Sequence, residues 1–253
     1  DDRAWVEHLS VLPAAMIDEE SGAWSVSPVR DWSYEPSGPL RRDRTAAQFS
    51  PIDVQRIWFV VEPHPSLERY MAHTLVLLEL PGDRLIGLTI EARRETHEGY
   101  SAFGGLWNTY ELAYIWASAK DLLTRRAVYL DHAIHIYPID ITDTQREDFV
   151  ERLLEKTRAL GETPRFYNTL FSNCTNELAK TAGLDWSPAF VLTGLSAQQL
   201  FKEGVVPGDS FDAVDDQSDL TAPIIELNDQ TSATFDVALL LELRDRFAAI
   251  LDN

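Results

Sequence analysis

The chain of 253 residues has a single cysteine, Cys174, so it can form no intrachain disulfide. That absence removes the usual marker of an exported protein but does not argue against export. The sequence also lacks any run of about 18 apolar residues, and it therefore predicts no membrane span. It begins at Asp1 rather than at a methionine. We expect an upstream signal or anchor segment to have been removed.

Basic residues are scarce as well. Lys and Arg number 22 against 41 Asp and Glu, which gives a net charge of −19. This balance argues against nucleic acid as a partner, because phosphate binding needs clustered Lys and Arg. It also gives no general attraction to anionic lipid. The hydrophobic content of 45% is enough for a substantial core, and we expect one domain with appendages.

The middle of the chain predicts an antiparallel sheet. Residues 55–62 form an aromatic and β-branched run typical of a buried strand. Residues 73–80 and 84–92 follow as strands, separated by a Pro-Gly-Asp turn at 81–83. A further strand is expected at 111–116, and helical spacing of apolar residues predicts a helix over 142–160. The fold class is therefore α+β, with an antiparallel sheet packed with helices.

The flanking segments show weaker patterns. Residues 21–53 predict loops and short strands, with the four prolines of the segment as breakers: Pro28, Pro36, Pro39 and Pro51. Residues 204–229 are acidic and rich in turn formers. A helix is expected over 234–251, which either packs on the domain or leads to a membrane or partner segment.

Cys174 lies in a polar turn that also contains Tyr167 and Asn173. Glu177 and the residues after it read as helix, and Gly183 ends that helix. A thiol at a helix N-terminus has a lowered pKa, and the free N–H groups there can bind an oxyanion. Cys174 is therefore a candidate nucleophile. The alternative is a buried, inert thiol.

His73 and Glu91 lie at the two open ends of the predicted hairpin. Antiparallel pairing brings these ends together, so Glu91 can orient His73 if the register puts both side chains on one face. A slip of one residue separates them. The alternatives are a structural role for His73 and a surface ion pair between Glu91 and Arg93 or Arg94.

Asp131, His132 and His135 resemble a metal-ligand cluster. The residues around them alternate as in a strand, and no further Cys or His lies nearby to complete a tetrahedral set. We therefore predict no metal site, and no motif in the sequence calls for a cofactor.

The order of the candidate residues is histidine, acid and then cysteine. Papain-like enzymes have the cysteine before the histidine. A circularly permuted papain-like or NlpC-type fold gives the observed order while it keeps the geometry of nucleophile, base and orienting acid.

Several segments of the sequence resemble the Lnb N-terminal periplasmic domain family, long catalogued as a bacterial domain of unknown function. They are residues 30–34, 72–74, 90–94, 110–112, 136–138 and 166–175, and the phrase around Cys174 is the most specific of them. The resemblance covers about residues 30–183. It divides the chain into an N-terminal extension (1–29), a catalytic domain (30–183) and a C-terminal extension (184–253).

The resemblance implies an extracytoplasmic bacterial protein, usually membrane-anchored, with Cys174 and His73 as the catalytic pair. Members of the Lnb type are linked to N-acylation of lipoproteins, in which a cysteine accepts an acyl chain from a lipid and passes it to an amine. We therefore expect acyl transfer through a thioester, with lipid or lipoprotein as substrate.

Residues next to the proposed catalytic group are the candidates for substrate binding: Arg93, Arg94, Asn173 and Tyr167. Two other functions remain open. A cysteine peptidase or amidase predicts a more polar cleft, and a non-catalytic binding module predicts that Cys174 and His73 lie apart or that the thiol is sealed from solvent.

Overall fold

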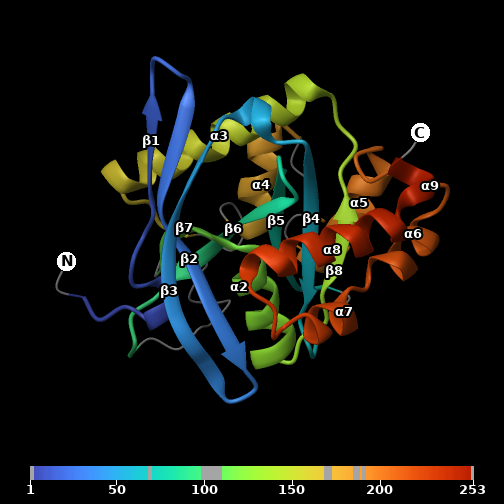
Figure 1. The fold of residues 1–253 in the computed structure, drawn as a ribbon, viewed down its shortest axis with the longest axis horizontal. Coiled ribbons are helices and arrows are strands. Elements are labelled where there is room, and N and C mark those ends of the chain that lie inside the picture. The colour runs from blue at the N-terminus through green and yellow to red at the C-terminus, as the bar shows by residue number, and fades with distance from the viewer. Residues whose placement is uncertain are drawn as a thin grey trace.

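The computed structural model describes residues 3–67, 70–97, 110–167, 173–184, 189 and 192–251. Within them, eight strands form one sheet in the order β1-β2-β7-β6-β5-β4-β8, with β3 paired to β2 (Figure 1). The strands are β1 (Ala14–Asp18), β2 (Ala23–Glu35), β3 (Gly38–Phe49), β4 (Arg56–Pro63), β5 (Ala72–Leu80), β6 (Arg84–Arg93), β7 (Glu111–Ser118) and β8 (His135–Pro138). β2 and β7 run parallel, whereas the other neighbours are antiparallel.

Helices cover both faces of the sheet. They are α2 (Ala119–Thr124), α3 (Asp143–Glu162), α4 (Cys174–Ala182), α5 (Ser196–Lys202), α6 (Phe211–Ser218), α7 (Thr221–Glu226), α8 (Ser232–Arg246) and α9 (Ala248–Leu251), with short 3-10 helices at Glu7–Leu9, Pro51–Asp53 and Thr193–Leu195. α3 and α4 lie on one face, and α2 and α8 on the other (Figure 1). Successive side chains of a strand point to opposite faces of the sheet. In β5, Val76 therefore faces α3 and α4, while Leu77 faces α2.

The strands predicted in the middle of the chain are confirmed as β4, β5, β6 and β7. The turn at 81–83 joins β5 to β6, with Asp83 at φ 54° and Gly82 at φ 79°. The helix predicted over 142–160 is α3, and Thr142 caps it in a capping box with Gln145. The protein is thus α+β, as expected, with a mixed and mostly antiparallel sheet.

The prediction of loops and short strands for 21–53 is wrong. β2 and β3 form a long antiparallel hairpin there. Pro28 lies inside β2, at a register shift between Val26 and Val29, and Pro39 lies near the start of β3. Proline is tolerated at such an irregularity and on an edge strand, because its missing N–H leaves no ladder bond broken.

The acidic segment 204–229 is also more regular than predicted, because it contains α6 and α7. The helix predicted over 234–251 is present as α8 and α9. α8 packs on the domain, since its side chains Phe235, Leu239, Leu240 and Leu243 are buried.

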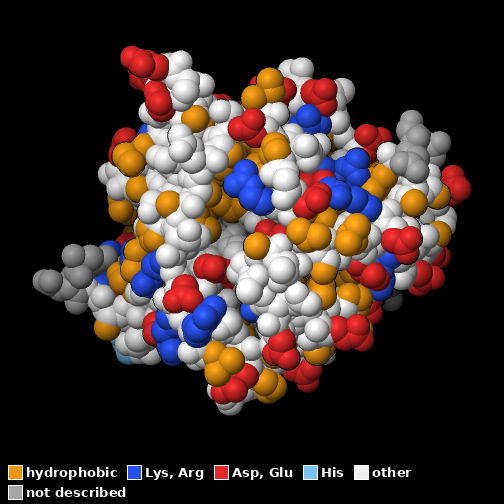
Figure 2. Space-filling view, viewed as in Figure 1, with side chains coloured by type: hydrophobic (Ala, Val, Ile, Leu, Met, Phe, Trp, Pro, Cys, Tyr) orange, Lys and Arg blue, Asp and Glu red, His pale blue; other side chains and the backbone are white. Residues whose placement is uncertain are grey.

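The segments taken from the sequence as extensions contribute to the same core as the central sheet. Trp24, from the N-terminal part, and Phe235 and Phe247, from the C-terminal part, are all buried in one apolar cluster with the strands β4 to β7. On the surface, Figure 2 shows many acidic side chains over the C-terminal helices.

At Gly87 in β6, a side chain of α2 lies close to the backbone of the sheet. A Cβ atom at this position would lie 2.3 Å from Leu122 Cδ1 and 2.9 Å from Leu77 Cδ2. Gly87→Ala is therefore expected to lower the free energy of unfolding by about 1–3 kcal/mol, through overpacking. Urea unfolding followed by circular dichroism measures this change.

Gly161 in α3 provides the matched control, because nothing lies within 4 Å of a Cβ built there. Gly161→Ala is expected to stabilise the protein by up to about 1 kcal/mol, since alanine has the higher helix propensity. Equal effects of the two substitutions would contradict the close approach of α2 to β6.

Candidate functional site

Cys174 is the first residue of α4, so the thiol lies at a helix N-terminus as predicted, although the helix begins three residues before the predicted start at Glu177. Asn173 caps the helix, and its side chain accepts a hydrogen bond from the Asn176 N–H at 2.7 Å. The helix ends at Gly183, whose φ of 74° is left-handed. The N–H groups of Cys174 and Thr175 belong to the first turn and have no acceptor within the helix. Residues 168–172 of the predicted polar turn lie outside the described residues.

His73 and Glu91 lie on one face of the sheet. The β5–β6 register pairs Leu75 with Thr89, and the same register sets His73 opposite Glu91. His73 Nε2 lies 3.4 Å from Glu91 Oε1 and 2.6 Å from the Thr89 hydroxyl, which in turn donates to Glu91 Oε1 at 2.9 Å. Glu91 therefore contacts His73 both directly and through Thr89, so Nδ1 is the ring nitrogen left for the thiol.

A second carboxylate flanks His73 on the opposite side. β4 pairs Glu62 with His73, so one row across the sheet contains Glu62, His73 and Glu91. Arg126 spans this row, with Nε 2.7 Å from Glu62 Oε2 and Nη2 3.2 Å from Glu91 Oε1. Because Arg126 is 2% exposed, it holds both carboxylates in a water-poor environment, where charge pairing is strong.

The electrostatics of the site polarise the Cys174–His73 pair. Burial by itself raises the pKa of Cys174, but the charge of His73 and a hydrogen bond from it lower that pKa from 9.0 to about 7. Burial also lowers the pKa of His73, but Glu91 and then Cys174 outweigh it and raise that pKa to about 10. Burial raises the pKa of Glu91, but the charge of His73 and a hydrogen bond to it outweigh burial, so that this pKa lies well below 4.5. Thiolate and imidazolium therefore coexist near neutral pH.

A cavity of about 460 Å³ opens onto this pair. His73, Glu91 and Cys174 line it, together with three of the four predicted substrate-binding residues, Arg94, Asn173 and Tyr167. The fourth, Arg93, is not among the lining residues. It is 7% exposed, and its guanidinium donates to the carbonyl oxygens of Leu9 and Ser10 and contacts Glu111.

The sequence did not single out four residues of this site. Glu62, Arg125 and Arg126 line the cavity, and the Thr89 hydroxyl contacts His73 and Glu91. Glu62 lies near the end of β4 and pairs with His73 of β5, so strand pairing alone could have suggested it. Arg125 and Arg126 come from a π-helical turn, Arg125–Tyr129, that follows α2. A single π-helical turn gives no repeating pattern of apolar residues, so the sequence does not reveal it.

His132 and His135 point to different partners. His132 lines the cavity, and its Nδ1 lies 2.5 Å from Glu62 Oε1. His135 Nδ1 lies 2.8 Å from the Ser218 hydroxyl. Within the described residues, no group of three or more potential metal ligands comes together.

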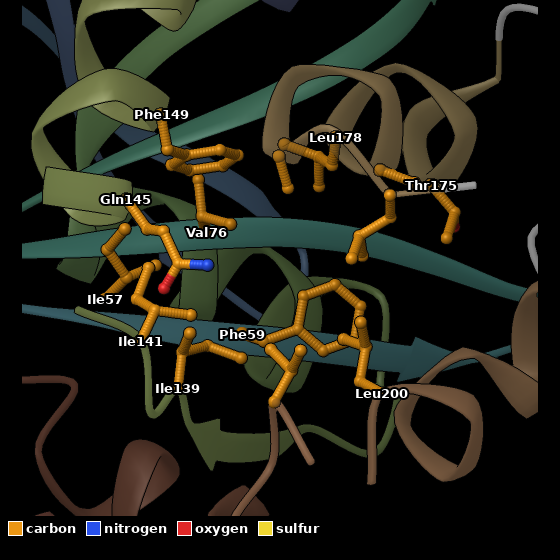
Figure 3. Close-up of a pocket in the computed structure, with 14 residues that line it drawn as sticks. Ile57, Phe59, Val76, Ile139, Ile141, Gln145, Phe149, Thr175, Leu178 and Leu200 are labelled. Carbon is orange, nitrogen blue, oxygen red and sulfur yellow. The ribbon is translucent and has the colours of Figure 1, made fainter. Parts of the chain in front are cut away.

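A second, apolar cavity of about 110 Å³ lies between the sheet and helices α3 and α4. Figure 3 shows Phe59, Ile139 and Leu200 on one side of it, with Val76, Phe149 and Leu178 opposite. Thr175 lines this cavity, and its hydroxyl lies 3.9 Å from Cys174 Sγ. One residue therefore contacts both the thiol and the apolar cavity.

One family model matches most of the chain. The model of the Lnb N-terminal periplasmic domain matches residues 41–213, which include every residue discussed above as a candidate for chemistry. The chain belongs to this family. No curated protein and no solved structure is detectably similar to it.

The family description places this Lnb-type domain outside the cytoplasm. In the part of the chain that the structure describes, no helix is both long and apolar enough to cross a bilayer.

Proposed function

We propose that this Lnb-type domain is a cysteine acyltransferase that works through a thioester. The observation that carries the proposal is the polarised pair of Cys174, with its pKa near 7, and His73, with its pKa near 10, at the wall of a cavity of about 460 Å³. A thiolate beside an imidazolium is an activated nucleophile next to a general acid. As part of this proposal, we take the site to be a permuted papain-like one.

In the first half of the reaction, Cys174 Sγ attacks the carbonyl carbon of an acyl ester. The carbonyl oxygen becomes an oxyanion, which the N–H groups of Cys174 and Thr175 at the start of α4 stabilise. The C–O bond then breaks, and the leaving alcohol takes the proton of His73. The products are an acyl thioester on Cys174 and a neutral imidazole.

In the second half, an acceptor amine attacks the thioester carbonyl carbon and His73 takes its proton. The C–S bond breaks, which releases an amide and restores the thiolate–imidazolium pair. Glu91 orients His73 throughout, both directly and through Thr89. Arg94, Asn173 and Tyr167 line the cavity and contact the substrate. We propose a lipoprotein amine as acceptor and a membrane lipid as donor, with the full-length protein held at the membrane.

The apolar cavity supports an acyl donor. It lies beside Thr175, and its lining is almost entirely aliphatic and aromatic. An acyl chain on Cys174 could extend past Thr175 into this space, where burial of each methylene contributes about 0.8 kcal/mol.

A second candidate is hydrolysis of peptide or cell-wall amides. The observation that favours it is the polar lining of the catalytic cavity, which includes Glu62, His64, Arg94, Arg125 and His132. Such groups suit a polar substrate, with water in place of the acceptor amine.

Intact-mass spectrometry tests the acyltransferase. The protein is incubated with vesicles of phosphatidylethanolamine and phosphatidylglycerol, alongside Cys174→Ala and His73→Ala. We expect the wild type to gain the mass of one fatty-acyl group and both variants to gain none. Hydroxylamine at neutral pH should remove the added mass, because it cleaves thioesters.

The absence of an added mass, together with rapid alkylation of Cys174 at neutral pH, would shift the assignment to the hydrolase. Release of new amines from peptide and cell-wall fragments would then be the activity to measure. Slow alkylation of Cys174 at neutral pH would contradict both enzymatic assignments.

A further inference from the structure

The catalytic cavity contains a guanidinium that the proposed chemistry does not use. Arg125 follows α2 and lines the cavity with Cys174 and His73. Its partner is His8, whose Nε2 lies 3.3 Å from Arg125 Nη2. Among the described residues it forms no ion pair with a carboxylate. The neighbouring Arg126, in contrast, contacts both Glu62 and Glu91.

The surroundings of Arg125 leave its charge uncompensated. Burial lowers the pKa of Arg125, and so does the charge of Arg126, while Glu91 acts in the opposite direction without reaching contact distance. Arg125 is partly buried, and a cation withdrawn from water is costly unless a counter-charge contacts it. An anion bound at this place would remove that cost.

His8 adds a neutral hydrogen-bonding group to the same place. Burial lowers its pKa to about 3, and the charges of Arg125, Arg30 and Arg94 contribute. The imidazole is therefore uncharged at neutral pH. Its Nε2 accepts from Arg125, which leaves the proton on Nδ1 as a further donor.

Arginines gather in the lining of this cavity although the protein is acidic. They are Arg94, Arg125 and Arg126. Arg126 pairs with Glu62 and Glu91, whereas no carboxylate of the described residues lies within ion-pair distance of Arg125. The whole chain carries a net charge of −19, so a cavity wall that contains three arginines favours an anionic ligand there.

We propose that Arg125, together with Arg94 and His8, forms a subsite for an oxyanion of the substrate, a phosphate or a carboxylate group, next to the Cys174–His73 pair. This inference rests on the proposed function, since it assigns part of the substrate of the same site. Arg125 binds the anion through its guanidinium and so places the scissile carbonyl at Cys174 Sγ.

Ligand binding tests the subsite without any chemistry at the thiol. Inorganic phosphate and acetate are titrated calorimetrically into Cys174→Ala, at constant ionic strength. The same titrations are made into Cys174→Ala combined with Arg125→Gln, with Arg125→Lys or with Arg41→Gln. Arg41 is exposed on β3, so its loss changes the net charge equally without touching the cavity.

We expect Arg125→Gln to weaken binding of one of the two anions about tenfold or more, because a partly buried, charge-assisted guanidinium–anion pair is lost. Arg125→Lys should retain part of the affinity, and Arg41→Gln all of it. Preferred binding of phosphate identifies a phosphate ester as the substrate class, and preferred binding of acetate identifies a carboxylate. Equal affinities in the Arg125→Gln and Arg41→Gln proteins, or no binding of either anion, would overturn the subsite.

Alkylation of the wild-type thiol then separates this inference from the proposed function. Iodoacetate and iodoacetamide have nearly the same size and differ in charge. Arg125→Gln is expected to lower the rate with iodoacetate about fivefold relative to iodoacetamide, through the lost charge. A fast reaction with iodoacetamide and an unchanged ratio would contradict the subsite alone. A slow reaction with iodoacetamide would contradict the activated thiol, while the calorimetry still decides the subsite.

Discussion

Replacing His73 by alanine is expected to move the pH midpoint of Cys174 alkylation upward by about two units or more. In the wild type the pKa of the thiol is about 7, because His73 outweighs the effect of burial. Without His73, burial remains, and the pKa returns to 9.0 or higher. At pH 6 the thiolate fraction then falls about 100-fold. A more basic thiolate is a better nucleophile, which recovers about five- to tenfold, so the net loss in rate is roughly tenfold or more.

The measurement is the rate of reaction with iodoacetamide between pH 5 and pH 10. The wild-type rate should rise through about pH 7 and then stay level, because the thiolate persists after the imidazolium loses its proton near pH 10. His97→Ala is the control, since His97 is an exposed imidazole with a side chain 73% accessible. An identical midpoint in the His73→Ala and wild-type proteins would show that His73 does not activate the thiol.

The acyl-transfer rate should depend on pH in a different way from alkylation. It needs the thiolate to attack and the imidazolium to protonate the leaving alcohol. The rate is therefore expected to rise through about pH 7 and to fall through about pH 10, the apparent pKa values of the pair.

The hairpin and the cysteine turn show what the sequence can determine. The Pro-Gly-Asp turn predicted where β5 and β6 reverse, and the helix formers from Glu177 to the stop at Gly183 predicted α4 to within three residues of its start. These are local signals, each read from a few neighbouring residues. They placed His73 and Glu91 at one end of the sheet, but only the register decided that both face the same side.

The β2–β3 hairpin could not be predicted in the same way. β3 is an edge strand, and most of its side chains are exposed, so no alternation of apolar and polar residues marks it. Its pairing with β2 is a contact between strands, which neither strand shows alone. The prolines of this segment favoured loops in the sequence-based prediction, although an edge strand accommodates proline.

The cavity lining was the least predictable part of the site. Arg125 and Arg126 lie in an otherwise ordinary helical segment, and nothing in their neighbours points to a catalytic cavity. Their place at the cavity depends on the turn after α2, which brings Arg126 to Glu62 and Glu91 and Arg125 to His8. Contacts of this kind depend on tertiary packing, and a single sequence does not specify them.

Asp121→Asn is expected to lower the free energy of unfolding by about 3–5 kcal/mol, because it leaves a buried cation unpaired. Asp121 is fully buried in α2. Its carboxylate accepts from Arg30 Nε at 2.9 Å and Nη2 at 2.7 Å, and also from the Trp32 N–H at 2.8 Å. The asparagine keeps the shape but loses the charge that balances Arg30. Since Asp121 joins β2 to α2, and α2 leads into Arg125 and Arg126, the substitution should also loosen the cavity wall.

Urea unfolding of Asp121→Asn and Asp43→Asn compares the loss of the same charge at a buried and at an exposed position, and so separates the effect of burial on the free energy of unfolding from the effect of net charge. Asp43 also pairs with an arginine, but at 3.5 Å and with side chains 73% and 58% accessible for Arg41 and Asp43. Asp43→Asn is expected to cost less than about 0.5 kcal/mol, as for other exposed pairs. Both proteins have the same net charge, so a similar stability for the two would mean that Arg30 finds another partner when Asp121 is neutral. A large loss for Asp121→Asn alone, together with slower alkylation of Cys174, would show that the buried pair supports the cavity as well as the fold.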